Sequence, residues 1–332
     1  MSKAKTKVIK KRCKSIQEVV EAVMNVITTE RSLSPGEDVE YFFRGESCNY
    51  LHKGDPNAVL SSKFGCYLDR AKAWWSHEHE LYREALRLNV ASFHDDKTMV
   101  ERVGRMQHYG LPTRFADAST NALVALHFAL GGGNVNIDQR EASDKEDGFI
   151  RVLKVSRKKL KSFSSDIIAA IAHLPMVKPE DVNPSRVNGL EALRYEITNE
   201  RPGFSMSIRQ NGSDRMKRLE KLLRKEIRQV WVFKPIWNNR RIVNQDGVFL
   251  AFGCGMGKKP LNPDFSRRNF GDEKAPSNGI MQVDYVQIAA EAKKDIRENL
   301  RYFGMQVESG YPDLWNVCNE ISARMKEREG LL

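Results

Sequence analysis

The chain has 332 residues, of which 41% are hydrophobic and 9% aromatic, enough apolar material for one large domain or two small ones. Its five cysteines are scattered, without a C-x-x-C pair, which argues against a disulfide framework and a structural zinc site. No apolar run is long enough to span a bilayer and the basic N-terminus lacks a secretory signal, so we expect a cytoplasmic protein with no membrane partner.

The net charge is +11, from 54 Lys and Arg against 43 Asp and Glu. Residues 1–14 contain seven basic residues and no acidic one, and we interpret them as a flexible arm that is either solvated or bound to a polyanion. A second basic concentration lies on a predicted amphipathic helix at 214–228. Together the two segments favour a nucleic-acid partner, with phosphate contacts from Arg215, Lys217, Arg218, Lys221, Arg224 and Lys225.

The first predicted element is a helix over about residues 16–30, because Ser15 and Glu18 have the spacing of a capping box. Val39–Phe43 forms a predicted strand that ends at Arg44-Gly45. The next elements are an irregular stretch at 46–69 and helices at 70–91 and 98–109, the last capped by Thr98 and Glu101.

Residues 107–121 are predicted to form a loop before an almost wholly apolar, buried helix at 121–130. The polar stretch that follows, to residue 147, is predicted as a surface loop. Further strands are expected at 149–155, 229–233, 242–252 and 281–289, and helices at 158–172, 214–228, 290–303 and 313–326. The pattern favours an α+β fold with one domain over residues 15–332, in which helix 15–31 is an N-terminal extension.

The segment Phe42-Phe43-Arg44-Gly45 places an arginine at the end of an aromatic strand, directly before a glycine. The planar guanidinium suits a phosphate or a carboxylate, and the glycine lets a ligand approach the backbone closely. The alternative is that Arg44 pairs with a buried acid such as Asp117 and only stabilises the fold. The pattern by itself leaves both possibilities open.

The second signature directly precedes the apolar helix and reads Gln107-His108-Tyr109-Gly110-Leu111-Pro112-Thr113-Arg114-Phe115-Ala116-Asp117-Ala118-Ser119-Thr120-Asn121. Four of its last five residues can cap a helix, which is more than one helix start requires. We expect the surplus hydroxyl groups, near the positive end of the helix dipole, to bind a phosphate or a ribose.

Other side chains have two interpretations each. His108 is a residue of the site, as a general acid or base or stacked on a base, or it is a hydrogen-bonded core group. Tyr109 either stacks on an aromatic ligand or packs against neighbouring side chains. Arg114 reaches a phosphate or pairs with Asp117. A third candidate, Gln245-Asp246-Gly247-Val248-Phe249, places an amide beside a glycine on a hydrophobic strand, and its alternative is a turn or bulge.

These signatures, in this order, resemble the FRG domain family, which is named for the triplet present here as Phe43-Arg44-Gly45. The resemblance includes the blocks at 107–129 and 245–249 and a tail at 311–314, and it spans about residues 39–325. The chain departs from the family pattern at Phe115-Ala116 and Ala118, and it has Glu46 where the family usually has glutamine.

The order of the FRG blocks is similar to that of ADP-ribosyltransferases of the Arg–Ser–Glu type, which implies a mixed β core, NAD as substrate and no metal. Gln245 then takes the place of the acid, and because it is uncharged, Glu46, Asp117 or Asp246 has to compensate. The implied catalytic residues are Arg44, Ser119, Gln245 and Glu46. The implied NAD contacts come from Arg44, Gly45, His108, Tyr109, Arg114, Asp117 and Thr120.

The resemblance implies a toxin or phage-defence effector that transfers ADP-ribose from NAD to a nucleic acid, RNA ahead of DNA, and that has a neutralising antitoxin protein. One alternative is a non-catalytic module that binds a nucleotide or nucleic acid through the same pocket. Another is an NAD hydrolase without a macromolecular acceptor. The analogy with the transferases rests on sequence pattern, and fold analogy does not establish function.

Overall fold

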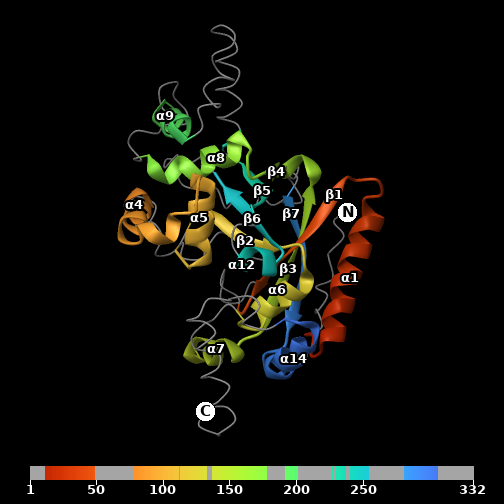
Figure 1. The fold of residues 1–332 in the computed structure, drawn as a ribbon. Helices are drawn as coiled ribbons and strands as arrows, with labels where there is room; N and C mark the ends of the chain where they lie inside the picture. Colours follow the sequence, from red (N-terminus) through yellow and green to blue (C-terminus); the bar gives the residue numbers. More distant parts are fainter. Residues whose placement is uncertain are drawn as a thin grey trace, which may run out of the picture.

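The computed structural model describes residues 12–48, 78–111, 113–132, 137–177, 191–200, 226–227, 229–236, 240–253 and 280–305. These residues form a mixed seven-stranded sheet with helices packed on it (Figure 1), so the predicted α+β class is confirmed. The strand order is β4-β5-β6-β2-β1-β3-β7, and only β4 and β5 pair in parallel.

The strands are β1 (Val39–Glu46), β2 (Phe115–Ser119), β3 (Gly148–Ser156), β4 (Leu160–Ser162), β5 (Val230–Lys234), β6 (Gly247–Phe252) and β7 (Ile280–Ile288). The α-helices are α1 (Ile16–Leu33), α4 (Glu78–Leu88), α5 (Met99–His108), α6 (Ala122–Ala129), α7 (Ile137–Asp144), α8 (Asp166–His173), α9 (Glu191–Glu200), α12 (Arg240–Asn244) and α14 (Lys293–Leu300). Short 3₁₀ turns are η2 (Val90–Phe93), η3 (Arg157–Lys159), η4 (Leu174–Met176), η6 (Ala290–Ala292) and η7 (Arg301–Phe303).

The sheet curls strongly because η3 alone joins β3 to β4. These strands stand five positions apart in the sheet order, which is about 24 Å in a flat sheet. The chain from Ser156 to Leu160 spans at most about 14 Å. The curl also brings Lys234 of β5 within 3.6 Å of Glu40 of β1, although two strands lie between them.

Side chains alternate between the inner and outer faces of this curl, as strand geometry requires. Phe42 joins an inner apolar cluster supplied by the strands, whereas Phe43 joins an outer cluster with α1, α6 and α14. Phe115 joins a second outer cluster with α5 and α8. The helices therefore cover the outer face in two groups (Figure 1), and the strand side chains fill the interior.

The predicted N-terminal caps of α1 and α5 are confirmed. Ser15 accepts a hydrogen bond from the Glu18 backbone N–H, and Thr98 and Glu101 form a complete capping box at α5. Helix α1 is part of the packed structure, because its buried valines lie in the outer cluster against β7 and α14.

Four local predictions were wrong. Residues 115–119 of the predicted loop form β2, because they pair with β6, a contact that local sequence does not reveal. The predicted surface loop before residue 147 contains α7. The predicted helix 158–172 begins only at Asp166, after η3 and β4, and the predicted strand 242–252 begins as α12. The predictions for residues 1–11, 49–77, 214–225 and 313–326 lie outside the described residues.

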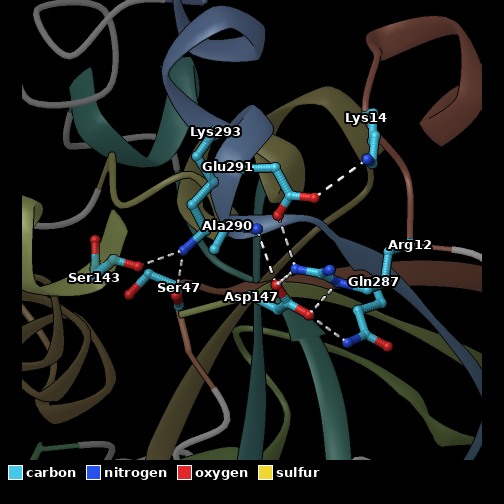
Figure 2. Close-up of polar contacts among 9 residues, drawn as sticks. All are labelled: Arg12, Lys14, Ser47, Ser143, Asp147, Gln287, Ala290, Glu291 and Lys293. Carbon is cyan, nitrogen blue, oxygen red and sulfur yellow. Dashed lines mark hydrogen bonds and ion pairs between the residues drawn. The ribbon is translucent and has the colours of Figure 1, made fainter. Parts of the chain in front are cut away.

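The chain is attached to the fold from Arg12 onward, although the sequence analysis counted residues 12–14 with the basic arm. Cys13 is buried and bridges to Ile288 of β7. The Arg12 guanidinium donates to Asp147 at 2.7 Å and to Glu291 at 2.9 Å (Figure 2). Asp147 also accepts from the Ala290 N–H at 2.9 Å, so one carboxylate ties the N-terminal segment to the end of β7.

Lys293, at the start of α14, is fully buried and holds the end of β1. Its Nζ donates to the Ser47 carbonyl at 2.6 Å and to the Ser143 carbonyl at 2.7 Å (Figure 2). These contacts join the segment after Glu46 to α7 and α14. Burial lowers the Lys293 pKa to about 8, because an ammonium group loses hydration in the interior.

We expect the free energy of unfolding to rise between about pH 8 and pH 10.5 through Lys293. In this window the unfolded chain binds the proton that the buried amine has lost, so raising the pH favours the folded state. Urea denaturation across this range tests the expectation, with Lys293→Met as the comparison. An identical pH dependence in both proteins would show that Lys293 does not titrate in this way.

We expect Gly45→Ala to destabilise the fold by more than about 3 kcal/mol, because the added Cβ would lie 1.8 Å from the Ala125 carbonyl oxygen of α6. Gly36→Ala is the control. It adds a methyl group in open space and costs only about 1–2 kcal/mol through its positive φ. Equal losses in thermal or chemical unfolding would contradict the close strand–helix contact.

Candidate functional site

The three sequence signatures meet in the sheet. Phe43 of β1 pairs with Ser119, the last residue of β2, and Ser119 pairs in turn with Gly247, the first residue of β6. The Ser119 hydroxyl donates to the Gln245 carbonyl at 2.7 Å. The described structure therefore places Arg44, Ser119 and Gln245 on neighbouring strands or directly beside them.

Arg44 belongs to a charged cluster on the inner face of the curl. Its Nε donates to Glu46 at 3.2 Å, and its Nη1 donates to the Asp117 carbonyl at 2.6 Å. Arg151, paired with Arg44 across β1 and β3, donates to the other Glu46 oxygen at 2.7 Å. Arg151 and Glu46 are buried, whereas the Arg44 side chain keeps 12% of its surface exposed. Two guanidinium groups therefore share one carboxylate, and Arg44 is the member of the cluster that a ligand can reach.

This cluster explains why the chain has Glu46 at a position where it departs from the FRG family pattern. The resembled family usually has glutamine there, but this chain also has a fully buried arginine at position 151. A buried guanidinium requires a countercharge, and Glu46 supplies it. Sequence reasoning missed Arg151, although a charged residue inside the apolar run 149–155 was a signal that a buried acid lies near.

A second polar network lies on the outer face around Asp117. The Gln107 amide donates to an Asp117 carboxylate oxygen at 2.9 Å, and the Thr113 hydroxyl donates to the Gln107 carbonyl oxygen at 2.8 Å. His108 Nδ1 lies 3.7 Å from the other Asp117 oxygen, and its buried ring contacts Phe249. The Asp117 side chain keeps 33% of its surface exposed. Gln107 and Thr113, which the sequence analysis did not assign, thus position Asp117.

The turn from Ser119 to Asn121 shows which residue caps α6. The Asn121 side chain accepts from the Leu123 N–H at 2.9 Å, and it donates to the Asp246 carboxylate at 3.1 Å. The Ser119 hydroxyl accepts from the Asn121 N–H at 3.0 Å while it donates to the Gln245 carbonyl, so its hydrogen bonds stabilise the turn. Thr120 is exposed at the tip.

The two polar networks project from opposite faces of the sheet. Arg44 shares the inner face with Phe42, whereas Asp117 and Ser119 share the outer face with Phe115. The sheet therefore stands between the Arg44 guanidinium and the Ser119 hydroxyl. A ligand that contacts both groups has to pass around the end of β2 at Thr120.

The remaining predicted site residues lie in different surroundings. The Arg114 guanidinium is buried in an ion pair with Glu78 of α4, at 2.6 Å, and it also donates to the Gly253 carbonyl. Burial raises the Glu78 pKa, although the Arg114 charge opposes the shift. Tyr109 is 61% exposed, and Gly45 packs its backbone against α6. Arg114 thus has a partner that the sequence analysis did not anticipate.

All six predicted nucleic-acid contacts between 215 and 225 lie outside the described residues. Within the described ranges, no group of three or more His, Cys, Asp or Glu side chains is arranged to hold a metal ion. In the same part of the chain, no helix combines the length and apolar character needed to cross a bilayer.

We expect Glu46→Gln to destabilise the protein by about 3–5 kcal/mol, because it removes the countercharge of a fully buried guanidinium. Chemical denaturation measures this loss. The double variant Glu46→Gln with Arg151→Met should recover part of the stability, since it removes the unpaired charge. A loss below about 1 kcal/mol in Glu46→Gln would contradict the structural role of this carboxylate.

Comparison with known proteins agrees with the sequence signatures. Residues 40–136 match the model of the FRG domain family, and this segment contains both Phe42–Gly45 and Gln107–Asn121, whereas Gln245 lies beyond it. No curated protein and no solved structure matches the chain. Residues 40–136 are therefore similar to the FRG domain, as the sequence signatures indicate.

Proposed function

We propose that this protein is an ADP-ribosyltransferase of the toxin or phage-defence class that transfers ADP-ribose from NAD to a nucleic acid, with RNA as the favoured acceptor. The observation that carries the proposal is the meeting of the Arg44, Ser119 and Gln245 segments on adjacent strands. Under this proposal, the curled mixed sheet is the transferase-like core. A neutralising antitoxin protein would bind the same molecule.

The proposed reaction breaks the bond between nicotinamide and C1′ of the ribose. The bonding electrons leave with nicotinamide, which becomes neutral, and C1′ gains oxocarbenium character. A nucleophile of the acceptor then bonds to C1′ and releases its proton. An enzyme accelerates this reaction by clamping the phosphates and ribose and by orienting the nucleophile.

Arg44 is the proposed clamp for the NAD phosphates. Of Arg44, Glu46 and Arg151, only Arg44 retains a partly exposed side chain. An anionic ligand at Arg44 would meet a guanidinium that Glu46 and the Asp117 carbonyl already hold in place. Glu46 already serves both arginines, so we assign it to holding Arg44 rather than to proton transfer.

Gln245 is the proposed ribose contact. Its amide can bond a ribose hydroxyl, but it offers no charge to the developing cation and accepts no proton. Asp246 is the neighbouring carboxylate, exposed beside Thr120 and held by Asn121. We propose Asp246 as the group that accepts the acceptor's proton.

A second candidate is a nucleotide-binding module without transferase activity. Two observations favour it: the Ser119 hydroxyl bonds within the turn, and the sheet stands between this hydroxyl and Arg44. Such a module would use Arg44 to bind phosphate and would leave NAD intact.

We expect labelled NAD to transfer its ADP-ribose to RNA, and we expect Gln245→Glu to raise the transfer rate at least tenfold. The substitution would place a carboxylate where the cationic transition state forms. Asn244→Asp is the matched control, because it introduces the same charge one residue away on the exposed surface. Arg44→Lys, checked for folding by thermal denaturation, should lose most of the activity, because lysine lacks the planar fork.

Free ADP-ribose without labelled polymer would identify an NAD hydrolase instead. Binding of NAD to the wild type, with no turnover even in Gln245→Glu, would identify the binding module. If NAD neither binds nor reacts, both assignments fail.

A further inference from the structure

We propose that a basic surface at the edge of the sheet, which we call the β4 patch, docks the phosphate backbone of single-stranded RNA. The β4 patch consists of Arg157, Lys158, Lys159, Lys161 and Lys234. This inference rests on the proposed function, because it assigns the place where the nucleic-acid acceptor binds. The β4 patch includes none of the residues assigned above to NAD binding.

The patch is built around one indole ring. The ammonium groups of Lys159 and Lys161 lie 4.2 and 4.4 Å from the centroid of the Trp231 ring. Both lysines project from the same face of the sheet as Trp231, since Lys161 pairs with Phe233 and alternate residues share a face. The ring therefore fixes two positive charges close together at a sheet edge.

The positive charge of the patch is only partly neutralised. Arg157 pairs with Asp38 and Glu40, and Lys234 pairs with Glu40. Among the described residues, no carboxylate lies within ion-pair distance of Lys158 or Lys161. Lys158 and Lys161 thus add positive charge that these two acids do not neutralise, and Lys158 is exposed at the surface.

Lysines on an edge strand also prevent unwanted strand pairing, which is the simpler explanation of such residues. The packing of the patch goes beyond it. Lys159 is buried and donates to Gln229, and Trp231 Nε1 donates to the Glu226 carbonyl at 2.9 Å, so these side chains form a packed structure.

The β4 patch lies within reach of the candidate site. The pairs Lys161–Phe233, Phe233–Phe249 and Phe249–Asp117 form one row across four neighbouring strands. Three strand spacings separate Lys161 from Asp117, which is about 14 Å or less on a curled sheet. Phe233 and Phe249 of this row are buried in the cluster with α5 and α8, so a polynucleotide held by the patch would reach the turn at Thr120 and Asp246 around these helices.

The test is binding of a fluorescent single-stranded oligoribonucleotide without NAD, measured against salt concentration. We expect Lys158→Glu with Lys161→Glu to weaken binding at least tenfold near 150 mM salt and to reduce the slope of log K against log salt by about 1.4, for two lost phosphate contacts. Lys159 stays intact because it packs on Trp231.

The control is Lys145→Glu with Lys294→Glu, which makes the same change of net charge at exposed positions after α7 and in α14. Both helices lie at the end of the molecule opposite β4 (Figure 1). Equal weakening by both double variants, or no RNA binding by the wild type, would overturn the proposal. Equally strong competition by polyglutamate would also overturn it. Because NAD is absent, failure of the transferase activity leaves this result unaffected.

Discussion

The three-residue connection between β3 and β4 is the constraint on which the rest of this fold depends. Two strands that stand five positions apart in the sheet are joined by η3 alone, so the sheet has to curl until its ends approach each other. The curl encloses an apolar interior filled by strand side chains, and it leaves the outer face to be covered by two groups of helices. Lys234 of β5 meets Glu40 of β1 across the curl and helps to hold it closed.

Burying a polar or charged side chain inside the curl costs free energy unless the side chain has a partner. Polar residues found there therefore point to specific interactions. Arg44, Glu46 and Arg151 project into it from two paired strands, and each buried charge there requires a partner. The end of the Phe-Arg-Gly signature and the residue after it thus each have a structural role. Gly45 lets β1 approach α6, and Glu46 is the carboxylate that Arg44 and Arg151 share. A single partly exposed arginine at the edge of this cluster is the feature that supports binding of an anionic ligand.

The second signature serves mostly to build the turn that brings β2, β6 and α6 together. Asn121 caps α6, Ser119 bonds to Gln245 and Asn121, and Gln107 with Thr113 fixes Asp117. Such a turn is rigid, and it leaves Thr120, Asp246 and part of Asp117 facing solvent. Rigid support with a few exposed polar groups is what a binding site needs, which is why we place the proposed chemistry at this turn.

The sequence by itself determined the α+β class, the FRG signature, the capped starts of α1 and α5, and most strands, because capping spacing and apolar patterns are local properties. It did not reveal β2 within residues 107–121, since this strand depends on pairing with the distant β6, and it did not reveal the helical turn before β6. Only the tertiary structure showed that Arg114 pairs with Glu78 and that Arg151 shares Glu46 with Arg44. It also decided that Arg44 and Ser119 lie on opposite faces, because the face that a side chain occupies depends on the register of its strand.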